Sequence, residues 1–170
     1  MRRYVATTTT IAAGVLLALA GAAQAASKSD SFQVSAQVAK NCVINAPDLD
    51  LGIFDGTNNL LSSAAISIRC TAGTNYDVDL STGSSGAYAS RTLVNGADTL
   101  AYNLYTTNTY GTIWGDTTAG TGRPATGIGT GMALVNAQTL TVYGRLLAAS
   151  NAGPVTAGTY TDTIVATITY

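Results

Sequence analysis

Two seven-residue stretches decide the fold: FQVSAQV at residues 32–38 and IVATITY at residues 164–170. In both, alternate side chains form an apolar set, the pattern of a β-strand with one buried face. The two sets are Phe32, Val34, Ala36 and Val38, and Ile164, Ala166, Ile168 and Tyr170. Chain ends are ordinarily frayed and tolerant of change. We therefore expect these apolar strand patterns at the two ends to join other chains.

Residues 1–25 have the organisation of an export signal. Arg2 and Arg3 give a positive start, residues 11–20 are apolar, and Ala23-Gln24-Ala25 is a small-x-small cleavage site. The apolar run is too short to span a bilayer. We expect residues 1–25 to be removed and the mature chain not to insert into a membrane; a retained N-terminal anchor is the alternative.

The composition limits the classes of partner. The sequence contains no histidine and no glutamate, and only 10% of its residues are charged. Without Arg2 and Arg3, six basic residues remain against nine acidic ones, a net charge of −3. Because there is no basic run, nucleic acid and anionic membrane surfaces are not expected as partners.

The sequence contains two cysteines, Cys42 and Cys70. An even number of cysteines in an exported chain predicts a disulfide. By the chain-entropy estimate, closing a loop of about 28 residues contributes roughly 3 to 4 kcal/mol.

Beyond the export signal, helical periodicity is absent and short alternating runs recur between Gly, Asn, Asp and Thr. This spacing predicts an all-β sandwich in a single domain. The expected strands include residues 32–38, 48–53, 64–70, 76–80, 100–104, 139–146 and 164–170. Asn95-Gly96 is a strong turn pair, and residues 117–131 form a long Gly/Thr-rich loop.

The residues that most enzymes need are missing. A Ser-His nucleophile has no histidine to act as its base, and two cysteines without histidine are too few for a zinc site. The only acids are aspartates beside apolar strand residues, which favours solvated outer faces. We therefore expect no enzymatic activity, cofactor or metal.

Three local patterns invite a binding interpretation, and each has a simpler one. Asp48, Asp50 and Asp55 lack the spacing of an EF-hand, so we expect them beside a turn. Residues 127–131 lack the spacing and the following helix of a phosphate loop. Trp114 is more typical of a core or loop anchor than of a sugar-stacking platform.

The apolar alternation at 32–38 has two readings. It is either an ordinary first strand in its own sheet or an exchange strand. A sheet with an unpaired edge and an open core groove can take up an extended segment from another chain. Backbone hydrogen bonds then give affinity, and alternate side chains give register.

A series of short motifs follows in one order along the chain. They are Phe32-x-Val34, Cys42, Leu51–Asp55, Cys70-Thr71, Tyr76–Val78, Arg91–Leu93, Leu100–Tyr105, Trp114–Asp116, Val142–Arg145, Ala157–Thr163 and the terminal β-run. Together, in this order, they resemble the spore coat protein U domain family, whose members include subunits of archaic chaperone–usher pili. The resemblance covers essentially the whole mature chain.

The resemblance implies an incomplete immunoglobulin-like sandwich that lacks its last strand, formed here by residues 42–170. A periplasmic chaperone supplies the missing strand, and at an outer-membrane usher the N-terminal segment of the next subunit replaces it. Residues 26–41 are then the donor-strand segment, with Phe32, Val34, Ala36 and Val38 as donor residues. Ile164, Ala166, Ile168 and Tyr170 flank the acceptor groove, and Cys42 and Cys70 tie the first two core strands together.

These expectations combine into a structural subunit of a surface fibre, exported through the periplasm and serving adhesion or biofilm formation. Its partners are the chaperone, the usher, and identical or related subunits. Two alternatives stay open: a structural protein of a spore coat or extracellular matrix, and a monomeric secreted sugar-binding module with Trp114 at its contact surface.

Overall fold

The computed structural model describes residues 25–170. The chain divides into two units, residues 1–36 and residues 37–170. The expected export signal, except for Ala25, lies outside the described residues. In the first unit, residues 25–36 form no regular secondary structure and are exposed. Every strand of the described chain belongs to the second unit.

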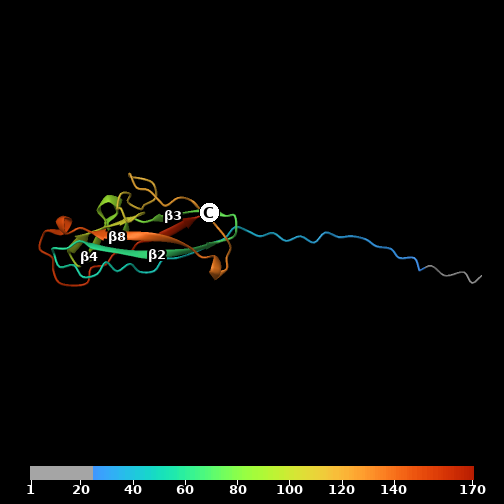
Figure 1. The fold of residues 1–170 in the computed structure, drawn as a ribbon, viewed down its shortest axis with the longest axis horizontal. Coiled ribbons are helices and arrows are strands. Elements are labelled where there is room, and N and C mark those ends of the chain that lie inside the picture. The colour runs from blue at the N-terminus through green and yellow to red at the C-terminus, as the bar shows by residue number, and fades with distance from the viewer. Residues whose placement is uncertain (1–24) are drawn as a thin grey trace, which may run out of the picture. The chain divides into compact units, whose positions relative to one another are not determined.

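The first sheet is built on two long strands that lie side by side (Figure 1). Its strand order is β1-β2-β8-β6, antiparallel throughout. The bounds are β1 (Cys42–Asn45), β2 (Leu60–Cys70), β8 (Gln138–Leu146) and β6 (Asn103–Tyr105). In β2 and β8, alternate side chains are buried, as the sequence alternation predicts.

The second layer combines a three-stranded sheet, β7-β3-β9, with a two-stranded hairpin, β4-β5. The bounds are β7 (Gly127–Ile128), β3 (Asn75–Leu80), β9 (Ala166–Thr169), β4 (Thr92–Asn95) and β5 (Asp98–Ala101). The hairpin turns at Gly96, whose φ of 60° favours glycine at this position. A bridge between Val94 and Thr161 joins the hairpin to the C-terminal segment. That segment therefore runs past β4 and then past β3.

Trp114 is fully buried in the core between the layers, and its Nε1 donates a hydrogen bond of 2.9 Å to the Val78 carbonyl. The prediction of a core anchor is confirmed. A sugar-binding surface built on Trp114 is ruled out, because no face of the ring reaches solvent.

A second buried group ties the layers together. Arg91 is 0% exposed, and its guanidinium donates to the carbonyls of Ser81 and Trp114 and to Oδ1 of Asn103, at distances of 2.6 to 3.1 Å. Burial lowers the pKa of Arg91. Since a buried cation is costly unless its donors are satisfied, these bonds fix the end of β3, the segment at Trp114 and β6 in one arrangement.

Three expected strands differ from the structure. Residues 32–38 form no β-ladder, so the reading as an ordinary first strand in its own sheet is wrong for this structure. Residues 48–53 form none either: Gly52 has a φ of 95°, which turns Ile53 outward to 92% exposure and puts Phe54 against the core instead. The expected strand 100–104 is divided between β5 and β6, because the chain changes sheets at Tyr102.

Cys42 and Cys70 lie directly opposite each other in the β1–β2 pair and form a disulfide across 28 residues of chain. We predict that Cys42→Ser lowers the free energy of unfolding by about 3 kcal/mol, because the unfolded chain regains the loop-closure entropy. Urea unfolding measures this. The double variant Cys42→Ser/Cys70→Ser should lose a similar amount, and an unchanged midpoint in both would contradict the prediction.

Candidate functional site

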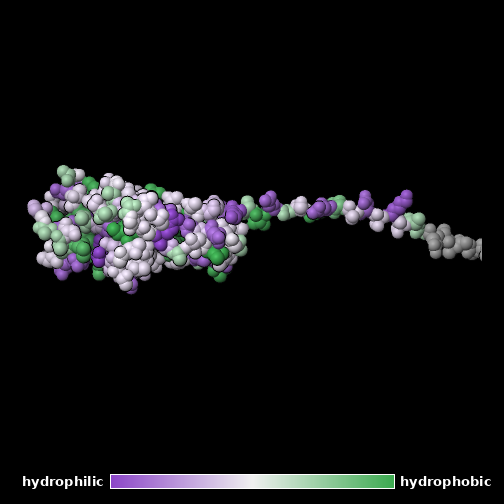
Figure 2. Space-filling model, turned by 90° about the horizontal axis from the view of Figure 1, so that it is seen from above, coloured by the Kyte–Doolittle hydropathy of each residue, from purple (hydrophilic) through white to green (hydrophobic). Residues whose placement is uncertain are grey.

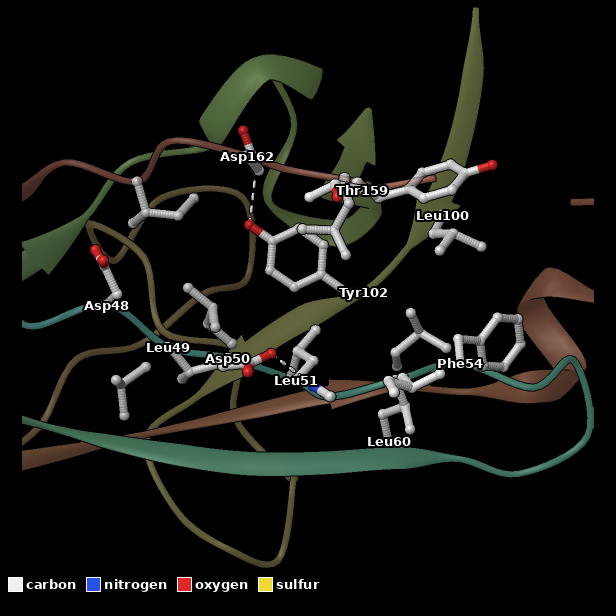
Figure 3. A pocket seen from close by; sticks show the side chains of 18 of the residues that line it. Asp48, Leu49, Asp50, Leu51, Phe54, Leu60, Leu100, Tyr102, Thr159 and Asp162 are labelled. Carbon is white, nitrogen blue, oxygen red and sulfur yellow. Dashed lines mark hydrogen bonds between the residues drawn. The ribbon is translucent and has the colours of Figure 1, made fainter. Parts of the chain in front are cut away.

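A groove of about 790 Å³ with a largely apolar floor runs into the core of the sandwich (Figure 3). One wall is the segment 46–55, and the other is the segment 155–166. The floor consists of core side chains from both layers: Leu60, Ile66, Leu80, Leu93, Leu100, Tyr102, Leu104, Val142 and Leu146. Protein cores leave few voids larger than a water molecule. A groove of this size along the core means that the sandwich is incompletely filled.

The first wall packs on β8 where β8 has no side chain. The side chains of Leu49, Leu51 and Phe54 pack against the core (Figure 3). A Cβ added at Gly144 would lie 2.8 Å from Leu51 Cδ2 and 2.9 Å from Leu49 Cδ2. The glycine of β8 therefore lets this wall approach the sheet closely.

The second wall has a free backbone edge. Its inward side chains, Tyr160, Asp162, Ile164 and Ala166, line the groove, and the odd-numbered residues between them are exposed. The backbones of Thr161 and Val165 bond to Val94 and Ser81 in the second layer. Since successive residues of a strand point their backbone groups to opposite sides, residues 162, 164 and 166 point theirs away from the second layer. In the described chain, β3 is the only strand that pairs with β9.

Tyr102 stands in the floor between the two walls (Figure 3). Its hydroxyl donates a hydrogen bond of 2.7 Å to Oδ2 of Asp162. Oδ1 of Asp162 accepts bonds of 2.8 Å from the backbone N–H groups of Ser84 and Thr163. Burial, and secondly the bond to Asp162, raise the pKa of Tyr102 well above its ordinary value of 10.0. The ring is therefore a neutral, fixed part of the groove.

Sequence reasoning named part of this site. Ile164 and Ala166 line the groove, whereas Ile168 packs on the core outside its lining and Tyr170 is 51% exposed. Sequence reasoning missed the wall 46–55 and the Tyr102–Asp162 pair. One signal could have found Asp162, since it is the only charged residue in the inward alternation from Tyr160 to Ile168.

The segment expected to donate a strand presents its apolar side chains to solvent. Phe32, Val34 and Val38 are 85%, 82% and 81% exposed. Figure 2 shows hydrophobic and hydrophilic residues interleaved along this extended segment. Large apolar side chains that share one exposed face normally mark an interaction site.

The remaining candidate sites have structural roles. Asp55 caps the turn at Thr57 and Asn58, and hydrogen bonds from Asn58 and Thr57 lower its pKa. Residues 127–128 form β7 rather than a phosphate loop. Arg123 forms ion pairs of 3.0 Å with Asp77 and Asp79. Within residues 25–170, no group of three or more His, Cys, Asp or Glu side chains could hold a metal ion.

The raised pKa of Tyr102 gives a prediction at alkaline pH. A group whose pKa is raised on folding contributes stability that is complete below its unfolded value, here 10.0, and is lost as pH rises above that value. We predict that the free energy of unfolding falls above pH 10 and that Tyr102→Phe makes this fall smaller. Tyr76 and Tyr88 also have raised pKa values, so the fall does not vanish.

Chemical denaturation across this pH range measures the effect. Tyr170→Phe, at the half-exposed C-terminus, is the matched control and should leave the slope unchanged. Equal slopes for the parent chain and Tyr102→Phe would be evidence that the buried hydroxyl does not titrate as described.

Comparisons with known proteins show which family the chain belongs to. The profile of the Spore Coat Protein U domain matches residues 28–167. Protein U of Myxococcus xanthus is 31% identical over 167 residues, covering 87% of this chain and 88% of the relative. A crystal structure of the CsuC–CsuE chaperone–tip adhesion subunit pre-assembly complex, from archaic chaperone–usher Csu pili of Acinetobacter baumannii, has a similar fold, with a TM-score of 0.55 and 23% identity. That match covers 78% of this chain and only 40% of the other. The chain belongs to the Spore Coat Protein U domain family.

Proposed function

We propose that this chain is a structural subunit of a surface fibre and that its copies join by donor-strand exchange. Residues 32–38 of one copy fill the groove of the next. The observation that carries the proposal is the combination, within one chain, of an open core groove, a free strand edge beside it, and an exposed segment with strand alternation. Backbone pairing with the edge and side-chain burial in the groove are the two components of strand addition.

The segment and the groove match in length. The donor stretch 32–38 and the inward part of the wall, 160–166, both contain seven residues. At about 3.3 Å per residue, each extends for roughly 20 to 23 Å. One copy therefore contains both halves of the joint, and the joints of a chain of copies need no other component.

Burial gives the joint its strength. Removing Phe32, Val34 and Val38 from water contributes roughly 1.5 to 3 kcal/mol each, on the order of 5 to 9 kcal/mol in total. Ordering the segment offsets part of this gain. Backbone hydrogen bonds along the free edge add to what remains, and slow dissociation makes the joint long-lived.

The same groove implies helpers before assembly. An open apolar groove next to a free strand edge is an aggregation hazard, so a periplasmic chaperone covers it in transit and an outer-membrane usher exchanges the chaperone for the next subunit. In this proposal residues 1–25 direct export, residues 26–41 carry the donor strand and residues 42–170 form the acceptor domain. The fold similarity to a chain of a chaperone–tip adhesion subunit complex supports this view.

The fibre lies at the cell surface, where its role is structural and serves adhesion or biofilm formation. Within residues 25–170, no helix is long and apolar enough to cross a membrane. The name of the family favours a second candidate, a structural protein of a coat or extracellular matrix. The same exchange of strands would build either structure.

A charge on the apolar face of the donor segment tests the proposal. We predict that Val34→Asp abolishes polymer while export continues, because an unpaired carboxylate cannot be buried in the groove. Polymer is measured as ladders on gels run without boiling, and export as the amount of chain in the periplasm.

Ser35→Asp is the matched control, since it adds the same charge on the opposite face of the segment. It should leave most polymer intact. The proposal fails if Val34→Asp polymerises like the parent chain, or if the two variants lose polymer equally.

A further inference from the structure

We propose that Tyr102, held by Asp162, fixes the register of the inserted segment by filling the middle of the groove, so that only a residue as small as Ala36 fits there. The inference rests on the proposed exchange of strands. It adds a specificity-determining side chain that neither the fold nor the alternation of the segment requires.

The first observation is the order of sizes along the donor face. Phe32, Val34 and Val38 are large or branched, and Ala36 between the two valines has a single methyl group. If every position of the groove were equally deep, Ala36 would leave a void. A small residue at one place in an apolar series fits a groove that is shallow at one place.

The second observation is a fixed aromatic ring in the floor, between the two walls (Figure 3). Tyr102 lies in the groove lining, is only 8% exposed and is anchored at both ends of the residue. Its hydroxyl donates to Asp162, and its backbone N–H donates to the Arg91 carbonyl at 3.0 Å. Asp162 is in turn fixed by two backbone N–H groups. The ring cannot move aside without leaving a buried hydroxyl unpaired.

These two observations define one register. If Ala36 lies beside Asp162 and the segment runs antiparallel to the wall, Val38 meets Tyr160 and Val34 meets Ile164. Phe32, the largest donor residue, then meets Ala166, the smallest inward residue of the wall. A parallel segment with the same anchor would instead place Phe32 at Gly158, beyond the inward series.

The backbone agrees with this register. Residues 162, 164 and 166 point their backbone groups to the free edge, and they would pair with donor residues 36, 34 and 32, all on the apolar face. A slip that keeps this face inward must be of two residues. Such a slip puts Val34 or Val38 against Tyr102, where neither fits.

Pairs of cysteines introduced on the outer face measure the register directly. Opposite residues in non-hydrogen-bonded antiparallel pairs lie closest, and the register places Ser35 of one copy opposite Thr163 of the next. Polymer of Ser35→Cys/Thr163→Cys should become covalently linked on mild oxidation. The matched pairs Ser35→Cys/Thr161→Cys and Ser35→Cys/Val165→Cys, which report a slip of two residues in either direction, should link at least about tenfold less.

Paired size changes test the role of Tyr102. Ala36→Leu should reduce polymer about tenfold or more by overfilling the site, and Tyr102→Ala in the same chain should restore most of it. Leu100→Ala, another floor position, is the control and should not restore it. If the double variant Ala36→Leu/Tyr102→Ala accumulates poorly, the cysteine pairs test the register instead, because they change only exposed positions.

Preferential linking through Thr161 or Val165, or full assembly of Ala36→Leu alone, overturns the register while leaving the exchange of strands standing. Absence of polymer from the parent chain overturns the exchange itself and the register with it.

Discussion

The structure depends on a strand edge that nothing in the second layer occupies. Within the described residues, β9 pairs with β3 on one side only, and the segment that leads into it, residues 160–166, borders the groove. A β-sandwich is stable when two faces bury each other and every edge is paired, short or covered. Here two unmet requirements lie side by side. The backbone groups of residues 162, 164 and 166 lack a partner strand, and the floor side chains beside them lack a covering strand. A single inserted strand would satisfy both, and this is the physical basis of the assembly that we propose.

A sandwich that is open along one side needs other means to hold its shape. The disulfide closes one end by tying β1 to β2. Arg91 and Trp114 fasten the layers through buried hydrogen bonds to carbonyls of Ser81, Trp114 and Val78. Tyr102 and Asp162 extend this network to the groove wall. These polar contacts keep the groove preformed, and preformed sites bind with a smaller ordering cost.

The sequence predicts the long, regular elements well. Alternation located β2, β3 and β8, in which Val78 and Val142 are buried, because strands buried on one face must alternate. It failed where a local backbone feature overrides the pattern, as at Gly52, or where the chain changes sheets, as at Tyr102. Two parts of the candidate site could not be predicted from the sequence. The wall 46–55 is positioned by packing over Gly144, and the Tyr102–Asp162 bond joins residues 60 positions apart.

The central claim is that one copy cannot close its own core. The most direct measurement is the thermal unfolding of the mature chain as an isolated monomer and as assembled polymer, at equal chain concentration. Our account predicts that the polymer unfolds at least about 10 °C above the monomer, because the joint adds several kcal/mol to each domain. A monomer that unfolds at the same temperature as the polymer, and that does not change when a peptide of residues 26–41 is added, would contradict it.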